Sequence, residues 1–258
     1  MEADKQISAV QRTLAILEAL SLSGAVNLES LSRITALPKA TLFRFLSTLS
    51  GLGYVYRDEA DLYHLSLKMF SVGSRSLDNM DIVSIAKPFA QRLCRELGET
   101  VHMGILEGDR AVYILKEESR YTIRMYSQVG KSIPLYCTAI GKVFLAEMSA
   151  PDRSGYFSSH ELKPYTARSI RNRETLEREL MRIPALGWAF DDAEHEDHIK
   201  CIAAPVRNYS SSVQAVLSVS WPEFRFEPGR KAEWGKLIKE TADELSAILG
   251  YSIERNKQ

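Results

Sequence analysis

The segment 27–65 constrains the fold most, because residue types that begin or end helices follow one another closely along it and divide it into short elements. Asn27 suits the start of a short helix, since its side chain can accept from the free N–H groups of a first turn. Pro38 opens a second helix, where its missing N–H costs nothing. Gly51 and Gly53 end that helix. The side chains expected to face inward are Leu28, Leu31, Ile34, Leu42, Phe45, Leu46 and Leu49.

Two flanking patterns complete this unit. After the second helix, the strand-like runs Tyr54–Arg57 and Leu62–Leu65 enclose a polar turn, which predicts a hairpin. Before the first helix, Ser8 can cap a further helix whose inward residues lie three or four apart, namely Val10, Leu14, Leu17 and Leu20. Helix, turn, helix and hairpin in this order are typical of a winged helix-turn-helix. We therefore expect a DNA-binding domain over residues 1–66.

The remaining sequence mixes helical and strand-like periodicities, which predicts an α+β protein whose second domain is α/β on an antiparallel or mixed sheet. A linker helix is expected over residues 67–80, and the second domain over 81–254. Its expected helices are 82–98, 138–148, 174–183 and 229–249, and its expected strands are 100–106, 111–116, 121–126, 201–206 and 213–220.

Composition limits the class of protein. The chain has 33 basic and 33 acidic residues and 45% apolar residues, so it is neither disordered nor uniformly basic. Its three cysteines are too few for a disulfide framework and indicate a reducing compartment. No apolar run reaches the ~18 residues of a membrane span, and the N-terminus MEADKQISAV lacks the features of a signal peptide. We expect a cytoplasmic protein without a membrane segment.

The helix after Pro38 carries the candidate DNA-reading surface. Residues 30–57 contain four basic residues and no acid. With its leucines buried, this helix turns a polar and basic face outward, and Arg44 has the reach to pair with guanine in a major groove. The alternative is a solvated basic face on an ordinary helix, and the acidic turn 58–61 predicts little contact between the hairpin and phosphates. The candidate DNA-binding residues are Arg33, Lys39, Ala40, Thr41, Phe43, Arg44, Ser47 and Arg57.

A second candidate site is the helix that begins after Thr138. If Thr138 is the cap, backbone N–H groups of the first turn point at whatever lies before the helix, and such an end binds a carboxylate well. The alternative is an ordinary capped helix. Gly141-Lys142 is followed by Val143 rather than Ser or Thr, so this is not a phosphate-binding loop.

The stretch 191–198 mixes carboxylates with His195 and His198, so a metal site deserves consideration beside a solvated acidic loop. Its spacing matches no known metal motif, and nothing nearby supplies a nucleophile with a positioned base. We expect no cofactor, no metal and no catalytic activity. A metal-responsive regulator and an enzyme acting on a small sugar acid stay open as alternatives.

These motifs together resemble one family. The stretch LPKATLFRFLSTLSGLGYV, within residues 8–65, resembles the DNA-binding domain of the IclR family of bacterial transcriptional regulators, and GWAFDDAEHEDHIKCIAAPVRN followed by VLSVSWP resembles its effector-binding domain. Within the family, TIRMYSQVGKSIPLYCTAIGKVFLA is most similar to repressors of sugar-acid catabolism, the 2-keto-3-deoxygluconate (KdgR-type) group.

The resemblance implies a GAF-like effector domain, a homodimer or homotetramer on a near-palindromic operator, and a small organic acid as effector, such as a sugar acid or its 2-keto derivative. By position, the backbone at Ala139 and Ile140 would receive the effector's carboxylate. The family usually has glycine where this chain has His198, whose side chain would narrow the pocket entrance, bind the effector or point to solvent. The other implied pocket residues are Thr122, Met125, Ile133, Asp191, Ile199, Cys201, Ser218 and Ser220.

Overall fold

The computed structural model describes residues 9–77, 81–122 and 126–252, and the chain divides into two compact units, residues 1–80 and 81–258. The two units are separate bodies with separate hydrophobic cores. None of the helices in the described ranges is both long and apolar enough to cross a membrane.

The first unit contains the expected three helices and hairpin. A core of leucines, isoleucine and valine joins them, with Leu31, Leu42 and Leu46 fully buried. The wing strands pair antiparallel, with Tyr56 opposite His64. Its elements are α1 (Ala9–Ser23), α2 (Leu28–Thr35), α3 (Lys39–Gly51), β1 (Val55–Arg57), β2 (Tyr63–Leu65) and α4 (Leu67–Leu77).

Local chemistry explains the turn between α2 and α3. The Asn27 side chain accepts from Ser30 N–H at 2.8 Å, as a capping residue should. Ala36 takes a left-handed backbone conformation (φ 53°) that ends α2. Pro38 is the residue just before α3 rather than its first residue, a shift of one position from the expected start. The turn is therefore built as predicted, within one residue.

The inward face of two helices was predicted only in part, since Leu20 and Leu31 are buried as expected but three other residues are exposed. Val10 and Leu14 on α1 are 68% and 52% exposed, and Ile34 on α2 is 54% exposed. The buried face of α1 is formed by Ile16, Ala19 and the expected Leu20, so the helix is rotated relative to the face that would include Val10 and Leu14. The expected cap Ser8 lies outside the described residues. Helical spacing alone did not distinguish which of two apolar faces packs on the core.

The acidic turn of the wing has a structural role. Asp58 accepts from the N–H groups of Ala60 and Leu62 and pairs with His64 Nε2 at 2.7 Å. Asp61, at φ 65°, pairs with Arg57 at 2.8 Å. These carboxylates hold the hairpin turn in shape.

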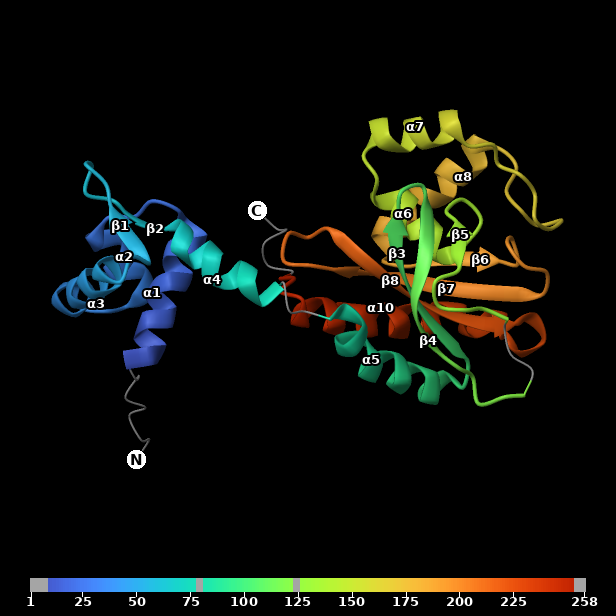
Figure 1. Ribbon diagram of the computed structural model, residues 1–258, viewed down its shortest axis with the longest axis horizontal. Coiled ribbons are helices and arrows are strands. Elements are labelled where there is room, and N and C mark those ends of the chain that lie inside the picture. The colour runs from blue at the N-terminus through green and yellow to red at the C-terminus, as the bar shows by residue number, and fades with distance from the viewer. Residues whose placement is uncertain (1–8, 78–80, 123–125, 253–258) are drawn as a thin grey trace. The chain divides into compact units, whose positions relative to one another are not determined.

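The second unit is a six-stranded, fully antiparallel sheet covered on both faces, with strand order β5-β4-β3-β8-β7-β6. In Figure 1, α6, α7 and α8 cover one face of this sheet and α5 and α10 cover the other. Its elements are α5 (Ile82–Leu97), β3 (Thr100–Glu107), β4 (Arg110–Glu117), β5 (Ser132–Pro134), α6 (Ala139–Glu147), α7 (Ala150–Ser159), α8 (Arg173–Leu180), α9 (Ile183–Leu186), β6 (Ala189–Asp192), β7 (Ile199–Arg207), β8 (Val213–Pro222), two short 3-10 turns (Glu223–Arg225 and Pro228–Arg230) and α10 (Lys231–Ile248).

The sequence missed both edge strands, β5 and β6, and the helices α7 and α9. The edge strands span three and four residues, too short for a period-two pattern to stand out. The strand expected over 121–126 is not present in its described part, since Tyr121 and Thr122 form a bend, and residues 123–125 lie outside the described ranges.

Candidate functional site

The outward face of α3 is the candidate DNA-binding surface. Of its predicted residues, Lys39, Ala40, Phe43, Arg44 and Ser47 are exposed, and Thr41 is half-buried. The opposite face is in the core, where Leu42 and Leu46 are fully buried. The helix thus presents to solvent a mixed face in which Lys39, Arg44 and Ser47 lie beside the apolar Ala40 and Phe43.

The basic side chains of the first unit differ in whether they already have an ion-pair or hydrogen-bond partner. Lys39 pairs with Glu29 at 3.3 Å, Arg33 donates to Ser30 Oγ at 3.1 Å, and Arg57 pairs with Asp61. The Arg44 guanidinium has no acidic partner among the residues the structure describes. Of the two basic residues on α3, Arg44 can therefore bind a ligand without first breaking an ion pair, whereas Lys39 cannot.

A pocket in the second unit collects most of the predicted effector residues. It lies between the sheet, the start of α6 and the segment 193–198, and its free space is about 10 Å³, which is room for about one water molecule. Eight of the ten predicted residues line it: Ile133, Ala139, Ile140, Asp191, Ile199, Cys201, Ser218 and Ser220.

The start of α6 has the geometry expected for binding an anion. Thr138 Oγ1 accepts from Gly141 N–H at 3.1 Å and donates to Pro134 O at 2.7 Å. No acceptor for the N–H groups of Ala139 and Ile140 is found within the described chain. Two free N–H groups at a positive helix end therefore face the pocket.

Close packing fixes this helix start in place. A Cβ atom at Gly141 would lie 2.2 Å from Leu135 Cα, so only glycine permits this approach of the two backbones. Lys142, the next residue, is fully buried. The N–H groups of α6 are consequently held in position before any ligand arrives.

The opposite wall supplies small polar groups. Ser218 Oγ donates to Ile202 O at 3.1 Å, and Cys201 Sγ donates to Ser220 Oγ at 3.2 Å. Behind them, His102 lies within hydrogen-bonding distance of Ser220 and Ser127. Burial, with smaller effects from Lys116 and Lys131, lowers the pKa of His102 to about 3, so the ring is neutral.

A buried ion cluster lies next to the pocket. Lys142 Nζ is 2.6 Å from Glu194 Oε1 and 2.6 Å from Glu179 Oε1. Burial tends to lower the pKa of Lys142, but the two carboxylates outweigh it and the pKa is raised. The same cluster touches the pocket through Asp191, whose Oδ1 accepts from Glu194 N–H at 2.7 Å.

Asp191 is 3% exposed, and its charge state decides what the pocket accepts. Burial raises the pKa of Asp191 to about 8, with Lys142 opposing and Glu194 adding to the rise. The carboxyl is therefore mainly protonated at pH 7 and can donate as well as accept. The protonated form does not repel a nearby carboxylate.

One predicted residue, Thr122, does not line the pocket. It is exposed, because the chain from 120 to 122 bends at the end of β4 rather than extending as a strand. Met125 lies outside the described residues. The sequence also missed four lining residues, Tyr113, Thr138, His195 and Glu196. Tyr113 alternates with the buried Ala111 and Leu115 on β4, a signal that was available but shared with any core strand.

His198 does not face the pocket. Its φ is 63°, a conformation that glycine adopts at little cost, and this explains why glycine suits the position. Its side chain is 83% exposed and contacts Glu223 at 3.2 Å. Of the three roles expected for it, the structure supports the solvent-facing one.

The stretch 191–198 is not a loosely solvated acidic loop, because Asp191 and Glu194 are buried. Within the ranges described, no three His, Cys, Asp or Glu residues come together in a way that could hold a metal ion. The histidines and carboxylates of this stretch instead bind protein groups, as in the pair Lys131–Glu196 at 3.4 Å.

Comparison with known proteins shows which family has this architecture. The family "Bacterial transcriptional regulator IclR C-terminal" matches residues 74–247, and "IclR helix-turn-helix domain" matches residues 9–59. The transcriptional regulator KdgR of Escherichia coli is 38% identical over 252 residues, covering 96% of both chains. The transcriptional repressor AllR of Klebsiella pneumoniae is 34% identical over 96% of this chain and 92% of its own.

The solved structure of the Agobacterium tumefaciens repressor BlcR agrees with these matches. It superposes with a TM-score of 0.80 at 26% identity, over 96% of this chain and 99% of that one. The resemblance inferred from the sequence motifs is confirmed along nearly the whole chain, in both the helix-turn-helix unit and the sheet unit. The chain belongs to the IclR family of bacterial transcriptional regulators.

Proposed function

We propose that this regulator represses genes of sugar-acid catabolism and that a small organic acid, a sugar acid or its 2-keto derivative, controls its hold on operator DNA. Family membership and the similarity to KdgR and AllR support the class of regulator. The observation that carries the effector class is the convergence of two free N–H groups at α6, the buried carboxyl of Asp191, whose pKa is raised by burial, and serine hydroxyls in one pocket.

The effector would be held at two ends. Its carboxylate accepts from the N–H groups of Ala139 and Ile140, where the helix end is positive. Its hydroxyls meet Ser218, Ser220 and the carboxyl of Asp191, which supply both donors and acceptors. The apolar side chains Ile133, Ile199 and Cys201 fill the remaining wall. An acid bearing several hydroxyls matches this pairing better than a plain fatty acid.

Effector binding would need a second conformation. The pocket's free space of about 10 Å³ is too small for any sugar acid, so the segment 193–198 must move for the ligand to enter. A ligand that binds only the opened state shifts the population toward it, and the affinity for DNA changes by the same coupling free energy. This supplies the regulatory switch without a chemical reaction, and we propose neither catalysis nor a cofactor.

On DNA, α3 would lie in the major groove. Arg44, Lys39 and Ser47 would face base edges and the nearest phosphates, with Ala40, Thr41 and Phe43 making close contacts to the groove. Arg33 and Arg57 would contact phosphates from α2 and from the wing, although Arg57 must share its charge with Asp61. Phosphate contacts add affinity without sequence preference, so Arg44 carries most of the proposed specificity.

The regulator would act as a homodimer or homotetramer in the bacterial cytoplasm. The exposed apolar side chains of α1, Val10 and Leu14, support pairing through the helix-turn-helix units. Such a dimer places two copies of α3 on half-sites one helical turn apart, or a multiple of that.

Fluorescence anisotropy tests this function directly. The full chain is titrated onto labelled DNA from upstream of its own gene, with unrelated DNA as competitor, with and without 2-keto-3-deoxygluconate and related sugar acids. Binding that survives competitor and weakens with one acid supports the proposal. Specific binding that no acid changes would remove the effector class, and binding that unrelated DNA abolishes would remove the regulator's specificity.

A further inference from the structure

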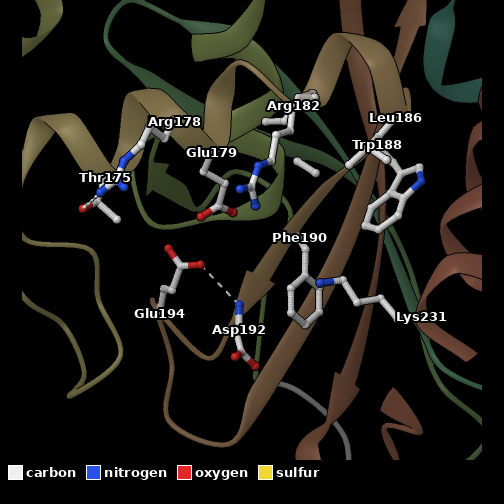
Figure 2. Close-up of a pocket in the computed structure, with 12 residues that line it drawn as sticks. Thr175, Arg178, Glu179, Arg182, Leu186, Trp188, Phe190, Asp192, Glu194 and Lys231 are labelled. Atoms are coloured by element: carbon white, nitrogen blue, oxygen red, sulfur yellow. Dashed lines mark hydrogen bonds between the residues drawn. The ribbon is translucent and has the colours of Figure 1, made fainter. Parts of the chain in front are cut away.

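A second concave site lies on the outside of the sheet unit, away from the effector pocket. We call it the outer groove and define it by Arg178, Glu179, Arg182, Trp188, Phe190 and Lys231. Helices α8 and α9 form one wall, β6 forms the other, and Lys231 at the start of α10 closes one end (Figure 2). Its volume is about 470 Å³, which is in the range of small-molecule sites.

The carboxylates that line the outer groove are already paired. Glu179 and Glu194 both bind the buried Lys142. Asp192 pairs with Lys200 at 2.7 Å and with Arg168 at 3.5 Å. Each of these acids therefore has a cationic partner, although Glu179 and Glu194 share one lysine and Glu194 Oε2 has no hydrogen-bond partner in the described chain.

The basic side chains of the outer groove, by contrast, have no acidic partner among the described residues. Arg178 donates only to the hydroxyl of Thr175, at 3.2 Å, and Arg182 and Lys231 have no acid within 4.0 Å among the described parts of the chain. Figure 2 shows Arg178 and Arg182 on the helical wall and Lys231 at the far end, over the Phe190 ring. The ammonium group of Lys231 is 3.7 Å from the centre of that ring. Burial lowers the pKa of Lys231, a cost that a bound anion would offset.

The groove surface between these charges is apolar and aromatic. Trp188 and Phe190 are half-buried, with the remaining part of each ring facing the groove, and Leu186 is 47% exposed. Trp188 is held against α10, where a Cβ at Gly235 would lie 2.4 Å from its indole ring. The Trp188 ring is thus packed closely on one side, and because Lys231 Nζ already lies over the Phe190 ring, the exposed part of Trp188 is the surface on which a planar ligand could stack.

We propose that the outer groove binds a small amphipathic organic anion, with a planar apolar body against the exposed part of Trp188 and its acidic group between Lys231 and the arginines that have no acidic partner. This ligand differs from the proposed effector, because the groove offers stacking surface where the effector pocket offers hydroxyls. Glu194 lies between the two sites. Its side chain lines the outer groove, and its N–H group donates to Asp191 Oδ1 of the effector pocket, so the ion cluster that contains Glu194 separates the groove from the pocket.

Calorimetric titration of the full chain with 2-naphthoate, a planar aromatic acid, tests the proposal. Naphthalene-2-carboxamide serves as the uncharged ligand of nearly the same shape. Arg178→Gln with Arg182→Gln should weaken 2-naphthoate binding roughly tenfold, since each exposed ion pair contributes up to about fivefold. Arg171→Gln with Arg173→Gln removes the same net charge outside the groove and should leave the affinity unchanged.

A second readout locates the ligand. Of the three tryptophans, Trp188 borders the groove and Trp221 and Trp234 lie in the core, so the Trp188 indole N–H signal in an NMR spectrum should shift on binding. Three results would each overturn the proposal: no binding of 2-naphthoate, equal binding of the carboxamide, or an unchanged affinity in the Arg178/Arg182 variant. Loss of binding in Ser218→Ala instead would place the ligand in the effector pocket and overturn it as well.

Discussion

Replacing Lys142 by methionine should destabilise the sheet unit strongly. Lys142 is fully buried, and its Nζ atom lies 2.6 Å from one carboxylate oxygen each of Glu179 and Glu194. Glu179 is one-third exposed and can turn to water, whereas the Glu194 side chain is 5% exposed and would stay buried without a cation. Removing one partner of a buried pair costs about 3–5 kcal/mol, and we expect that loss at pH 7.5.

The loss should depend on pH with a defined sign. Burial raises the pKa of Glu194, and Lys142 is the strongest influence that lowers it, so the substitution raises this pKa further. A carboxyl whose folded pKa lies above its unfolded value of about 4.3 binds more protons when folded. Stability of the variant therefore falls as pH rises through the folded pKa, and its deficit relative to the parent should be smaller at pH 5 than at pH 8.

Urea unfolding followed by tryptophan fluorescence measures this deficit, because all three tryptophans lie in the sheet unit and none in the helix-turn-helix unit. Lys131→Met is the matched control, since its pair with Glu196 is 40% exposed on the lysine side and should cost no more than about 1 kcal/mol. Lys142→Met combined with Glu194→Gln should recover part of the loss. A deficit below about 1 kcal/mol at pH 7.5, or a double variant no more stable than the single one, would refute the reasoning.

Three further changes have clear expected outcomes. Arg44→Ala should cost about 1–3 kcal/mol of operator binding with little effect on unrelated DNA, measured by competition anisotropy; equal losses on both DNAs would make Arg44 a phosphate contact. Asp191→Asn should flatten the dependence of stability on pH between about 4 and 8. In the parent the folded carboxyl keeps its proton to about pH 8, whereas the unfolded carboxyl loses it near 3.9. The parent therefore loses stability as pH rises across that window, and the variant should not. An equally steep profile in the variant would contradict the raised pKa. Gly141→Ala should lower the unfolding temperature by forcing Cβ against the Leu135 backbone, whereas Gly155→Ala on α7, where nothing lies within 4 Å, should leave it unchanged or raise it.

The winged helix-turn-helix was predictable because its signals are local. Asn27 caps α2 and the glycines end α3 through contacts within a few residues, which a sequence displays directly. The face of α1 was not predictable in the same way, since Val10, Leu14 and Ile16 are all apolar and only tertiary packing selects Ile16 for the core.

The candidate pocket was likewise predictable where its signals are local and not where they depend on tertiary packing. Thr138 and the free N–H groups after it follow from capping rules, whereas Ser218 and Ser220 were expected only from the resemblance to the family. The buried cluster follows from neither, because Lys142, Glu179 and Glu194 are up to 52 positions apart and come together only when α6 and α8 pack beside β6. A lysine in a helix is ordinarily read as solvent-exposed, and no local pattern reveals otherwise.

The contact between Gly141 and the Leu135 backbone also bears on how specificity changes within such a pocket. It fixes the start of α6, where we propose that the effector's carboxylate binds, to the segment before it, so that end of the helix cannot adjust to ligands of different length. In the segment 193–198, Ala193 and Glu194 are buried and hydrogen-bonded, so the side chains of His195 and Glu196 are the part of this wall left to adjust. Regulators with this arrangement can acquire new effectors by substitutions in one short loop while retaining an unchanged anchor for the acid group.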